Sequence, residues 1–227
     1  NNVWLLPLVT DVGYAWTDLR PLATIAVDEF LLWVNADAPH RDVVSFLEAV
    51  RSAGGRLEVA GSQSKDTDQV LVRQIEKTAG VSFTYVPFRS GSEAAVQLAG
   101  GHVDANINNP QENVSHWRAG MVRPLCVSAP PPLAYADVEG DGRSWADIPT
   151  CSEAGLPIER YQMPRTVWLP NGVTEEQATF YLDLFTQVPA TDEWKACVAR
   201  GAQSDLFLSG PELSHFIIRD EAQLRAQ

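Results

Sequence analysis

The residues best suited to chemistry are uncharged hydrogen-bonding groups that follow two predicted strands. The first group is the small polar loop Gly61-Ser62-Gln63-Ser64, and the second is Asn106-Ile107-Asn108-Asn109. Each leads into a predicted helix, whose start offers backbone N–H groups and the positive end of the helix dipole. Together they suit a carboxylate or another anion. The alternative is an ordinary strand-to-helix connection at the loop, with Asn108 and Asn109 serving only in turns and capping.

Two further kinds of group can support such a site. Asp66 or Thr67 is placed to cap the helix that follows the first loop. Arg89 follows a predicted strand and Arg165 lies in the extended stretch Ile158–Pro170, and a guanidinium can bind a carboxylate through two parallel hydrogen bonds. For each arginine the commoner role is that of a surface residue.

Patterns typical of enzymes are missing. Ser62, Ser64 and Thr67 could act as nucleophiles, but the sequence has no G-x-S-x-G elbow and no histidine close to them. It also has no H-E-x-x-H or C-x-x-C spacing. We therefore expect no catalytic residue, no metal and no cofactor.

Three cysteines, Cys126, Cys151 and Cys197, limit the redox chemistry. Their spacing is not that of a metal site, and at most one internal disulfide can form. The pairing stays open at this point, including a bond between Cys151 and Cys197.

Composition sets the broad class. The chain has 227 residues, a net charge of −12 and 45% apolar residues, enough for a sizeable core in one large or two small domains. Acidity argues against a nucleic-acid partner, which needs basic patches. No apolar run approaches the roughly 20 residues of a spanning helix, so we expect a soluble protein. The start, Asn1-Asn2-Val3-Trp4, is neither a signal peptide nor a start methionine, and we expect an upstream part to be absent.

The elements that position the two groups alternate between strands and helices. Residues 57–128 read as strand, helix, strand, helix, strand, helix and strand, which predicts an α/β domain with a parallel sheet. In such sheets ligands lie at the carboxyl ends of the strands, where both groups fall.

The flanks are expected to hold the other elements. Residues 1–20 read as irregular, Leu22–Asn35 as two extended segments and Val43–Ala53 as an amphipathic helix. A long surface loop is expected from Pro130 to Arg143, then a short helix after Thr150. Three capped helices follow, starting after Thr174, Thr191 and Ser209.

Several blocks, in this order, carry a family resemblance: LEVAGS, TYVPFRSGSEAAVQLAGGHVDANINNP, WRAGMVRPLCV, SWADIPTCSEAGLP and VWLPNGVT. With them the chain resembles the periplasmic substrate-binding receptors of tripartite tricarboxylate transporters, the Bug family. The resemblance covers almost the whole chain, but the proline- and glycine-rich loops at the front of family members are missing.

The resemblance implies an α/β fold of the type II periplasmic-binding-protein class, with two lobes around a ligand cleft and an incomplete first lobe. The second lobe would be residues 36–155, and residues 1–35 with 156–227 would form the first. The implied ligand-binding residues are Gly61, Ser62, Gln63, Ser64, Asp66, Thr67, Asn108, Asn109 and, in the back wall, Arg165. Gln63 and Lys65 stand where many members have glycine or a small residue.

The implied function is a periplasmic receptor, not an enzyme. It would bind an organic acid, either a di- or tricarboxylate or an aromatic carboxylate, and deliver it to the membrane subunits of a tripartite tricarboxylate-type transporter. We expect it to act as a monomer that closes two lobes on the ligand. The alternative is the effector-sensing domain of a transcriptional regulator with the same two-lobe fold.

Overall fold

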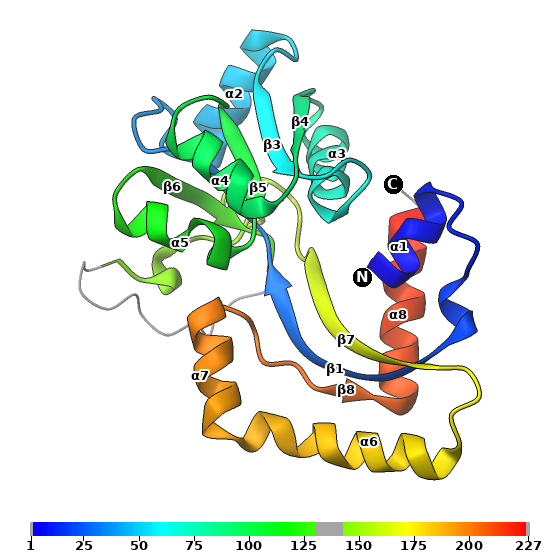
Figure 1. The fold of residues 1–227 in the computed structure, drawn as a ribbon. Helices are drawn as coiled ribbons and strands as arrows, with labels where there is room; N and C mark the ends of the chain where they lie inside the picture. The colour runs from blue at the N-terminus through cyan, green and yellow to red at the C-terminus, as the bar shows by residue number, and fades with distance from the viewer. Residues whose placement is uncertain (1, 130–142, 226–227) are drawn as a thin grey trace. The chain divides into compact units, whose positions relative to one another are not determined.

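The computed structural model describes residues 2–129 and 143–225. These residues form two compact units, each with its own sheet (Figure 1). Unit 1 comprises Asn1–Asp28 and Met163–Gln227, and unit 2 comprises Glu29–Gln162. The chain therefore passes between the units twice. The predicted lobe limits, at 35/36 and 155/156, stay a prediction.

Unit 2 is built on a five-stranded sheet in the order β4-β3-β5-β2-β6. Its strands are β2 (Leu31–Asn35), β3 (Glu58–Ser62), β4 (Thr84–Phe88), β5 (Ala105–Asn108) and β6 (Val122–Val127). Its helices are α2 (Val43–Ala53), α3 (Thr67–Ala79), α4 (Gly91–Ala99), α5 (Pro110–Arg118) and the 3-10 helix η2 (Trp145–Asp147).

The sheet of unit 2 is mixed, so the prediction of a parallel sheet was wrong in one respect. Strand β3 runs parallel to β4 and β5, as expected. Strand β2 lies between β5 and β6 and is antiparallel to both. Because β2 precedes the alternating segment 57–128, the strand–helix pattern of that segment does not predict that β2 lies between β5 and β6.

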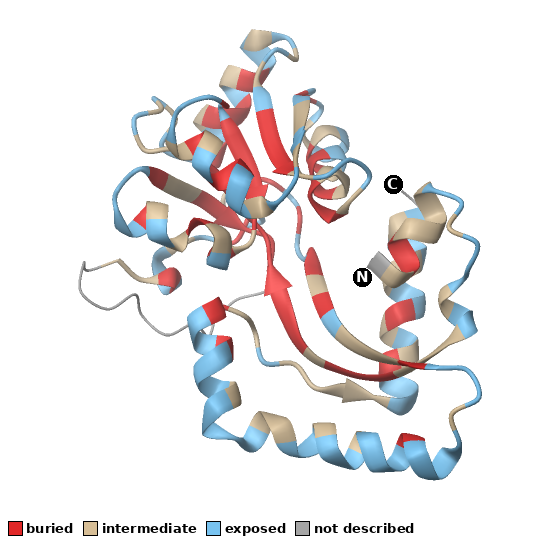
Figure 2. Cartoon of the chain, in the orientation of Figure 1, coloured by how far each residue is buried: buried red, intermediate tan, exposed pale blue. Residues whose placement is uncertain are grey.

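The core of unit 2 lies on both faces of its sheet. Trp33, Phe46, Leu71 and Leu98 are fully buried, and most of β2, β3 and β5 is drawn as buried in Figure 2. All four residues of β5 are buried, although successive side chains of a strand point to opposite faces. The polar side chains of this strand therefore lie inside the protein and need partners there.

Unit 1 has a three-stranded sheet in the order β7-β1-β8. Its strands are β1 (Leu19–Glu29), β7 (Gln162–Pro170) and β8 (Leu208–Ser209), and β1 is antiparallel to β8. Its helices are α1 (Asn2–Val9), η1 (Trp16–Asp18), α6 (Glu175–Gln187), η3 (Val188–Ala190), α7 (Asp192–Gly201) and α8 (Gly210–Arg225). The helices expected after Thr174, Thr191 and Ser209 are α6, α7 and α8, and the side chains of Thr174 and Thr191 cap the first two.

The expectation that residues 1–20 are irregular was wrong. They include the helix α1, even though Pro7 lies inside it. Trp4 is buried against Leu213 and Ile217 of α8, and its indole N–H donates to Asp220 Oδ2 at 2.7 Å. This packing stabilises α1, a helix that the pattern of its own eight residues does not predict.

Two other predicted segments differ in detail. The capping box of Thr150 and Glu153 is present, with Glu153 N to Thr150 Oγ1 at 3.2 Å and Thr150 N to Glu153 Oε2 at 3.0 Å. It encloses a turn rather than a helix. Of the surface loop expected from Pro130 to Arg143, residues 130–142 lie outside the described residues.

The cysteine pairing is resolved by the structure. Cys126 of β6 is bonded to Cys151, and both are buried. Cys197 is free and exposed. The disulfide joins β6, at the edge of the unit 2 sheet, to the turn that follows Thr150.

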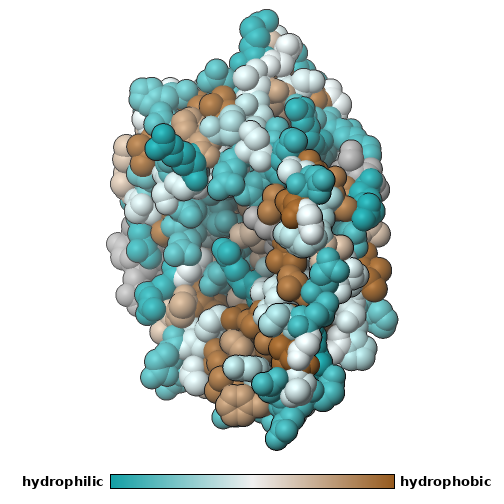
Figure 3. Space-filling view, turned by 45° about the vertical axis from the view of Figure 1, so that its right-hand side comes forward, coloured by the Kyte–Doolittle hydropathy of each residue, from teal (hydrophilic) through white to brown (hydrophobic). Residues whose placement is uncertain are grey.

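The surface of unit 1 carries apolar side chains on α6. Phe180, Tyr181 and Leu184 are exposed there, and apolar groups reach the surface at the lower end of Figure 3, where α6 runs in Figure 1. In the described ranges, no helix combines the length and the apolar character that crossing a membrane requires.

Candidate ligand-binding site

Three parallel strands of unit 2 end at the same edge of the sheet. In the register, Ser62 at the end of β3 is opposite Phe88 at the end of β4, and Ala60 is opposite Asn106 of β5. A helix starts soon after each strand: α3, α4 and α5. The sheet therefore brings the predicted groups 61–67 and 108–109 to one edge, as Figure 1 shows for β3 and β5.

The loop after β3 is held in an unusual backbone conformation. Gln63 and Lys65 have φ values of 51° and 61°, in the left-handed region that favours glycine. Gln63 N donates to Phe88 O at 2.7 Å, and Lys65 N donates to Gln69 Oε1 at 2.7 Å. These bonds fix the loop, and strain of this kind gathers at functional sites.

A buried carboxylate, Asp68, lies beneath this loop and was missed from the sequence. Its Oδ2 accepts from Ser62 N at 2.6 Å and from Ser62 Oγ at 2.9 Å. Burial raises the pKa of Asp68 to about 6, against the opposing effect of the Ser62 bonds. Both donors of Ser62 are therefore already used within the protein, so Ser62 shapes the loop.

Tyr85 of β4 holds the same loop from the other side. Its hydroxyl donates to Gln63 O at 2.9 Å and lies 3.2 Å from Ser62 O. Burial, followed by the charges of Asp68 and Asp66, raises the pKa of this phenol above its usual range. Gly61 leaves room for this arrangement, because a Cβ at that position would lie 2.5 Å from the Tyr85 hydroxyl and 2.7 Å from Asp68 Cβ.

The start of α3 is capped, as predicted, by Asp66. Its Oδ1 accepts from Thr67 N at 2.7 Å. Thr67 is buried, and its carbonyl accepts from the Tyr161 hydroxyl at 2.7 Å. The carboxylates of Asp66 and Asp68 offset the positive end of this helix, which makes it a weaker anion site than an uncharged helix start.

Asn108 and Asn109 join the start of α5 to its surroundings. Asn108 is buried, and its Nδ2 donates to Gly91 O at 2.8 Å and to Asn113 Oδ1 at 3.2 Å. Asn109 occupies the N-cap position, as predicted, but makes no side-chain bond to the helix. Its Nδ2 donates instead to Glu29 O at 2.7 Å. This helix start has no carboxylate at its cap and is followed by Pro110.

A third asparagine of this network was not singled out from the sequence. Asn113 Nδ2 donates to Asn106 Oδ1 at 3.1 Å, and both residues are buried. Asn106 Nδ2 has no hydrogen-bond partner in the described part of the chain. The sequence did not predict this contact, because a buried polar cluster under a helix start has no sequence pattern of its own.

Arg165 belongs to unit 1 and has a partner of its own. Its Nη2 is paired with Asp28 Oδ2, and Gln203 Nε2 donates to Asp28 Oδ1. The predicted site residues thus fall into two sets: those of unit 2, gathered at one sheet edge, and Arg165, held in the sheet of unit 1.

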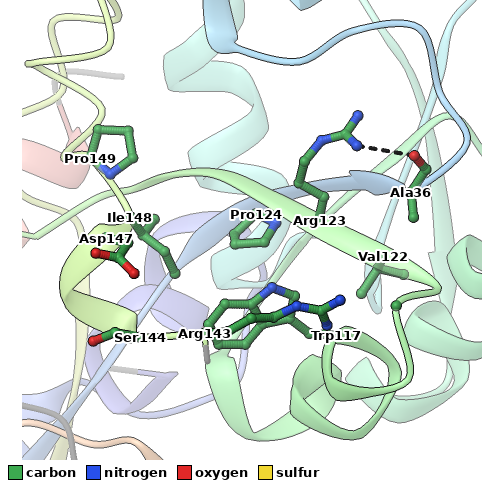
Figure 4. Close-up of a pocket in the computed structure, with 11 residues that line it drawn as sticks. Ala36, Trp117, Val122, Arg123, Pro124, Arg143, Ser144, Asp147, Ile148 and Pro149 are labelled. Carbon is green, nitrogen blue, oxygen red and sulfur yellow. Dashed lines mark hydrogen bonds between the residues drawn. The ribbon is translucent and has the colours of Figure 1, made fainter. Parts of the chain in front are cut away.

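A pocket of about 380 Å³ lies at the opposite edge of the unit 2 sheet. Ala36 follows the end of β2 and Val122 begins β6, and Asn35 pairs with Val122 across these strands. Figure 4 shows Trp117 and Arg143 in its wall and Arg123 reaching toward Ala36, whose carbonyl accepts at 3.0 Å. None of the predicted site residues lines this pocket.

The comparisons with known proteins decide the family. Residues 1–166 match the family model described as "Tripartite tricarboxylate transporter family receptor". The chain belongs to this family. The resemblance of its sequence blocks is therefore confirmed.

One relative of this chain is the UPF0065 protein in the gbd 5′ region of Cupriavidus necator, which is 22% identical over 217 residues. The match covers 94% of this chain and 62% of that protein. The chain thus spans less than two thirds of the length of this relative.

Solved structures share the fold. The periplasmic binding protein BugD is 14% identical with a TM-score of 0.81, over 99% of this chain and 74% of that one. MatC from Rhodopseudomonas palustris, solved with bound malate, is 20% identical with a TM-score of 0.79, over 99% and 75%. The predicted α/β fold of the periplasmic-binding-protein class is confirmed, while the incompleteness of the first lobe stays a prediction.

Proposed function

We propose that this chain is the larger part of a periplasmic receptor that binds a small organic acid and delivers it to a tripartite tricarboxylate-type membrane transporter. The observation that carries the proposal is the match of residues 1–166 to the receptor family. The malate bound to MatC, a protein of the same fold, supports a dicarboxylate as the ligand class. A receptor of this kind binds and releases its ligand without a chemical step.

The proposed ligand site is the edge of the unit 2 sheet where β3 and β5 end. An acid would be bound there by N–H, hydroxyl and amide donors rather than by a charged pair, as suits helix starts. The start of α5 is the stronger candidate of the two helix starts, because its cap, Asn109, is uncharged whereas Asp66 caps α3. Its first turn holds Pro110, which has no N–H, and Glu112, whose N–H donates to Asn109 O at 3.2 Å. The proposed ligand residues of unit 2 remain Gly61, Ser62, Gln63, Ser64, Asp66, Thr67, Asn108 and Asn109.

Arg165 differs from the other proposed ligand residues, because its side chain is already paired with Asp28. Its guanidinium already neutralises Asp28, so it can contribute to a ligand carboxylate only through donors that face away from that pair. We keep it as a proposed back-wall residue of unit 1 with a structural role first. The overall negative charge of the chain, −12, fits this emphasis on local donors.

A thermal-shift screen of the full-length protein tests the proposal. The panel holds malate, citrate and smaller dicarboxylates, acidic amino acids, terephthalate and nicotinate. A ligand at a hundredfold over its Kd should add about 2.7 kcal/mol to the free energy of unfolding. A folded protein that is stabilised by none of these acids would refute the receptor function.

A pair of variants ties the binding to the site. Asn109→Ala removes the bond to Glu29 O at the start of α5 and should weaken acid binding about tenfold. Asn171→Ala is the matched control, since Asn171 is an exposed turn residue of unit 1. Equal affinities for both variants would place the acid elsewhere.

A further inference from the structure

The buried carboxylate of Asp68 has one oxygen fully engaged and one with room for a proton. Oδ2 accepts from both Ser62 N and Ser62 Oγ. Oδ1 is 3.4 Å from Thr67 Oγ1, a long and weak contact. A proton on Oδ1 would face the Thr67 hydroxyl oxygen and would leave both Ser62 bonds in place. The residue is 4% exposed, so its charge is poorly solvated.

The groups around Asp68 make its charged form unfavourable. Asp66 in the loop is a second carboxylate, and Tyr85 of β4 directs its hydroxyl hydrogen to backbone carbonyls and not to Asp68. Thr67 and Ser62 offer neutral donors only. Burial is the largest cause that raises the pKa of Asp68 to about 6. The group therefore changes charge close to neutral pH.

We propose that Asp68 takes up a proton when an acid ligand binds at the ends of β3 and β5, so that the protein captures its ligand as an anion together with a proton. The inference rests on the proposed function. An anion placed over this loop repels the Asp68 carboxylate, and protonation removes the repulsion. The loop keeps its shape meanwhile, because Tyr85 binds the carbonyls of Ser62 and Gln63 in either charge state.

The sign of the pH dependence follows from this geometry. Above about pH 6 the Asp68 carboxylate is ionised and weakens the binding of an anionic ligand. Below about pH 6 Asp68 is protonated and no longer repels the ligand. Two like unit charges that repel each other by about 1 kcal/mol change an affinity about fivefold. Acid affinity should therefore rise about fivefold as the pH falls from about 8 to about 5.5, a range in which most carboxylic acid ligands stay ionised.

Isothermal titration calorimetry with malate tests the proposal, in two buffers of different ionisation enthalpy at each pH. We expect the wild-type protein to take up a fraction of a proton per malate near pH 6.5. Asp68→Asn keeps the shape and the acceptor for Ser62, and mimics the neutral acid. It should bind malate with the high, low-pH affinity at every pH and without proton uptake.

Asp66→Asn is the matched control. It removes a carboxylate from the same loop, while asparagine still caps α3, so the proton uptake should remain.

Malate binding that is independent of pH and takes up no proton in the wild-type protein would overturn the proposal while leaving the receptor function intact. If no acid of the screen binds, both proposals fall. A titration of the Asp68 carboxyl carbon by NMR, with and without malate, must show a pKa raised by the ligand.

Discussion

Asp28 and Arg165 form an ion pair within the sheet of unit 1, with a buried carboxylate and a half-exposed guanidinium. The Asp28 side chain is 5% exposed and the Arg165 side chain 51%. Gln203 binds the second oxygen of Asp28, so the carboxylate is satisfied on both sides. A residue expected from the sequence to meet a ligand thus neutralises a buried acid of its own unit.

The first prediction concerns this pair. Arg165→Ala leaves Asp28 buried with Gln203 as its remaining partner, and should lower the free energy of unfolding by about 1–3 kcal/mol, less than for a fully buried pair. Urea denaturation measures the change. Arg20→Ala is the control: Arg20 pairs with Glu175, whose side chain is 84% exposed, so the cost should stay below about 1 kcal/mol. Equal costs would mean that the Asp28 pair acts as a surface pair.

The second prediction concerns the Cys126–Cys151 disulfide, which closes a loop with a sequence separation of 25. Restricting that loop in the unfolded chain is worth about 3 kcal/mol. Replacing both cysteines by alanine should therefore lower the free energy of unfolding by about that amount, as measured by denaturation in urea. Cys197→Ser should leave it unchanged, because Cys197 is free and exposed. A double alanine variant as stable as the wild type would contradict the assigned pairing.

How far the sequence predicts the structure depends on the range of the contacts. Local patterns were sufficient for the caps Asp66, Thr174 and Thr191 and for the order of strands and helices from β3 to β6. The local sequence patterns did not predict the packing between distant segments. The helix α1 depends on Trp4 meeting α8, more than 200 residues later in the chain, as the separation of 216 between Trp4 and Asp220 shows.

The position of the candidate residues in the fold was predictable, but the groups that hold them in place were not. The alternating pattern predicts that the loop 61–64 and Asn108 lie at one edge of the sheet, where the structure has them. Asp68 was missed because a carboxylate in the first turn of a helix normally lies in solvent, favoured there by the dipole. Only the fold reveals that Asp68 turns inward to Ser62. Similarly, Tyr85 looks like an ordinary strand residue until the parallel register of β3 and β4 brings it under the loop.

The third prediction concerns Gln63 and Lys65, the two residues with left-handed backbone in the loop after β3. Gln63→Gly and Lys65→Gly relieve the positive φ values, and each should raise the free energy of unfolding by about 0.5 kcal/mol, since the entropy of glycine offsets part of the gain. If these side chains serve the ligand, acid affinity should fall in both variants. Ala202→Gly is the control, because Ala202 has a φ of 46° at the end of α7 in unit 1. It should gain stability with unchanged affinity. Glycine variants of the loop that bind more tightly would show that the strain serves no ligand.

The last prediction concerns stability and pH. The folded-state pKa of Asp68, about 6, lies above the ordinary value of about 3.9 expected in the unfolded chain. The folded protein therefore binds the proton more tightly, and the stability that Asp68 contributes is complete below about pH 3.9 and is lost as the pH rises through about 6. Between about pH 7.5 and pH 5 this residue should add about 1.4 kcal/mol to the free energy of unfolding.

Asp68→Asn should remove that part of the pH dependence and be more stable than the wild type at about pH 7.5, because it has no buried charge to desolvate. Asp104→Asn is the comparison, since Asp104 is an exposed carboxylate that accepts from Glu58 N at 2.8 Å. Asp68 is intact in this variant, so the contribution of Asp68 to the pH dependence should remain. Urea denaturation of the three proteins across this pH range measures the effect. Parallel stability curves for Asp68→Asn and the wild type would mean that Asp68 titrates at its ordinary pKa, in spite of its burial against Ser62.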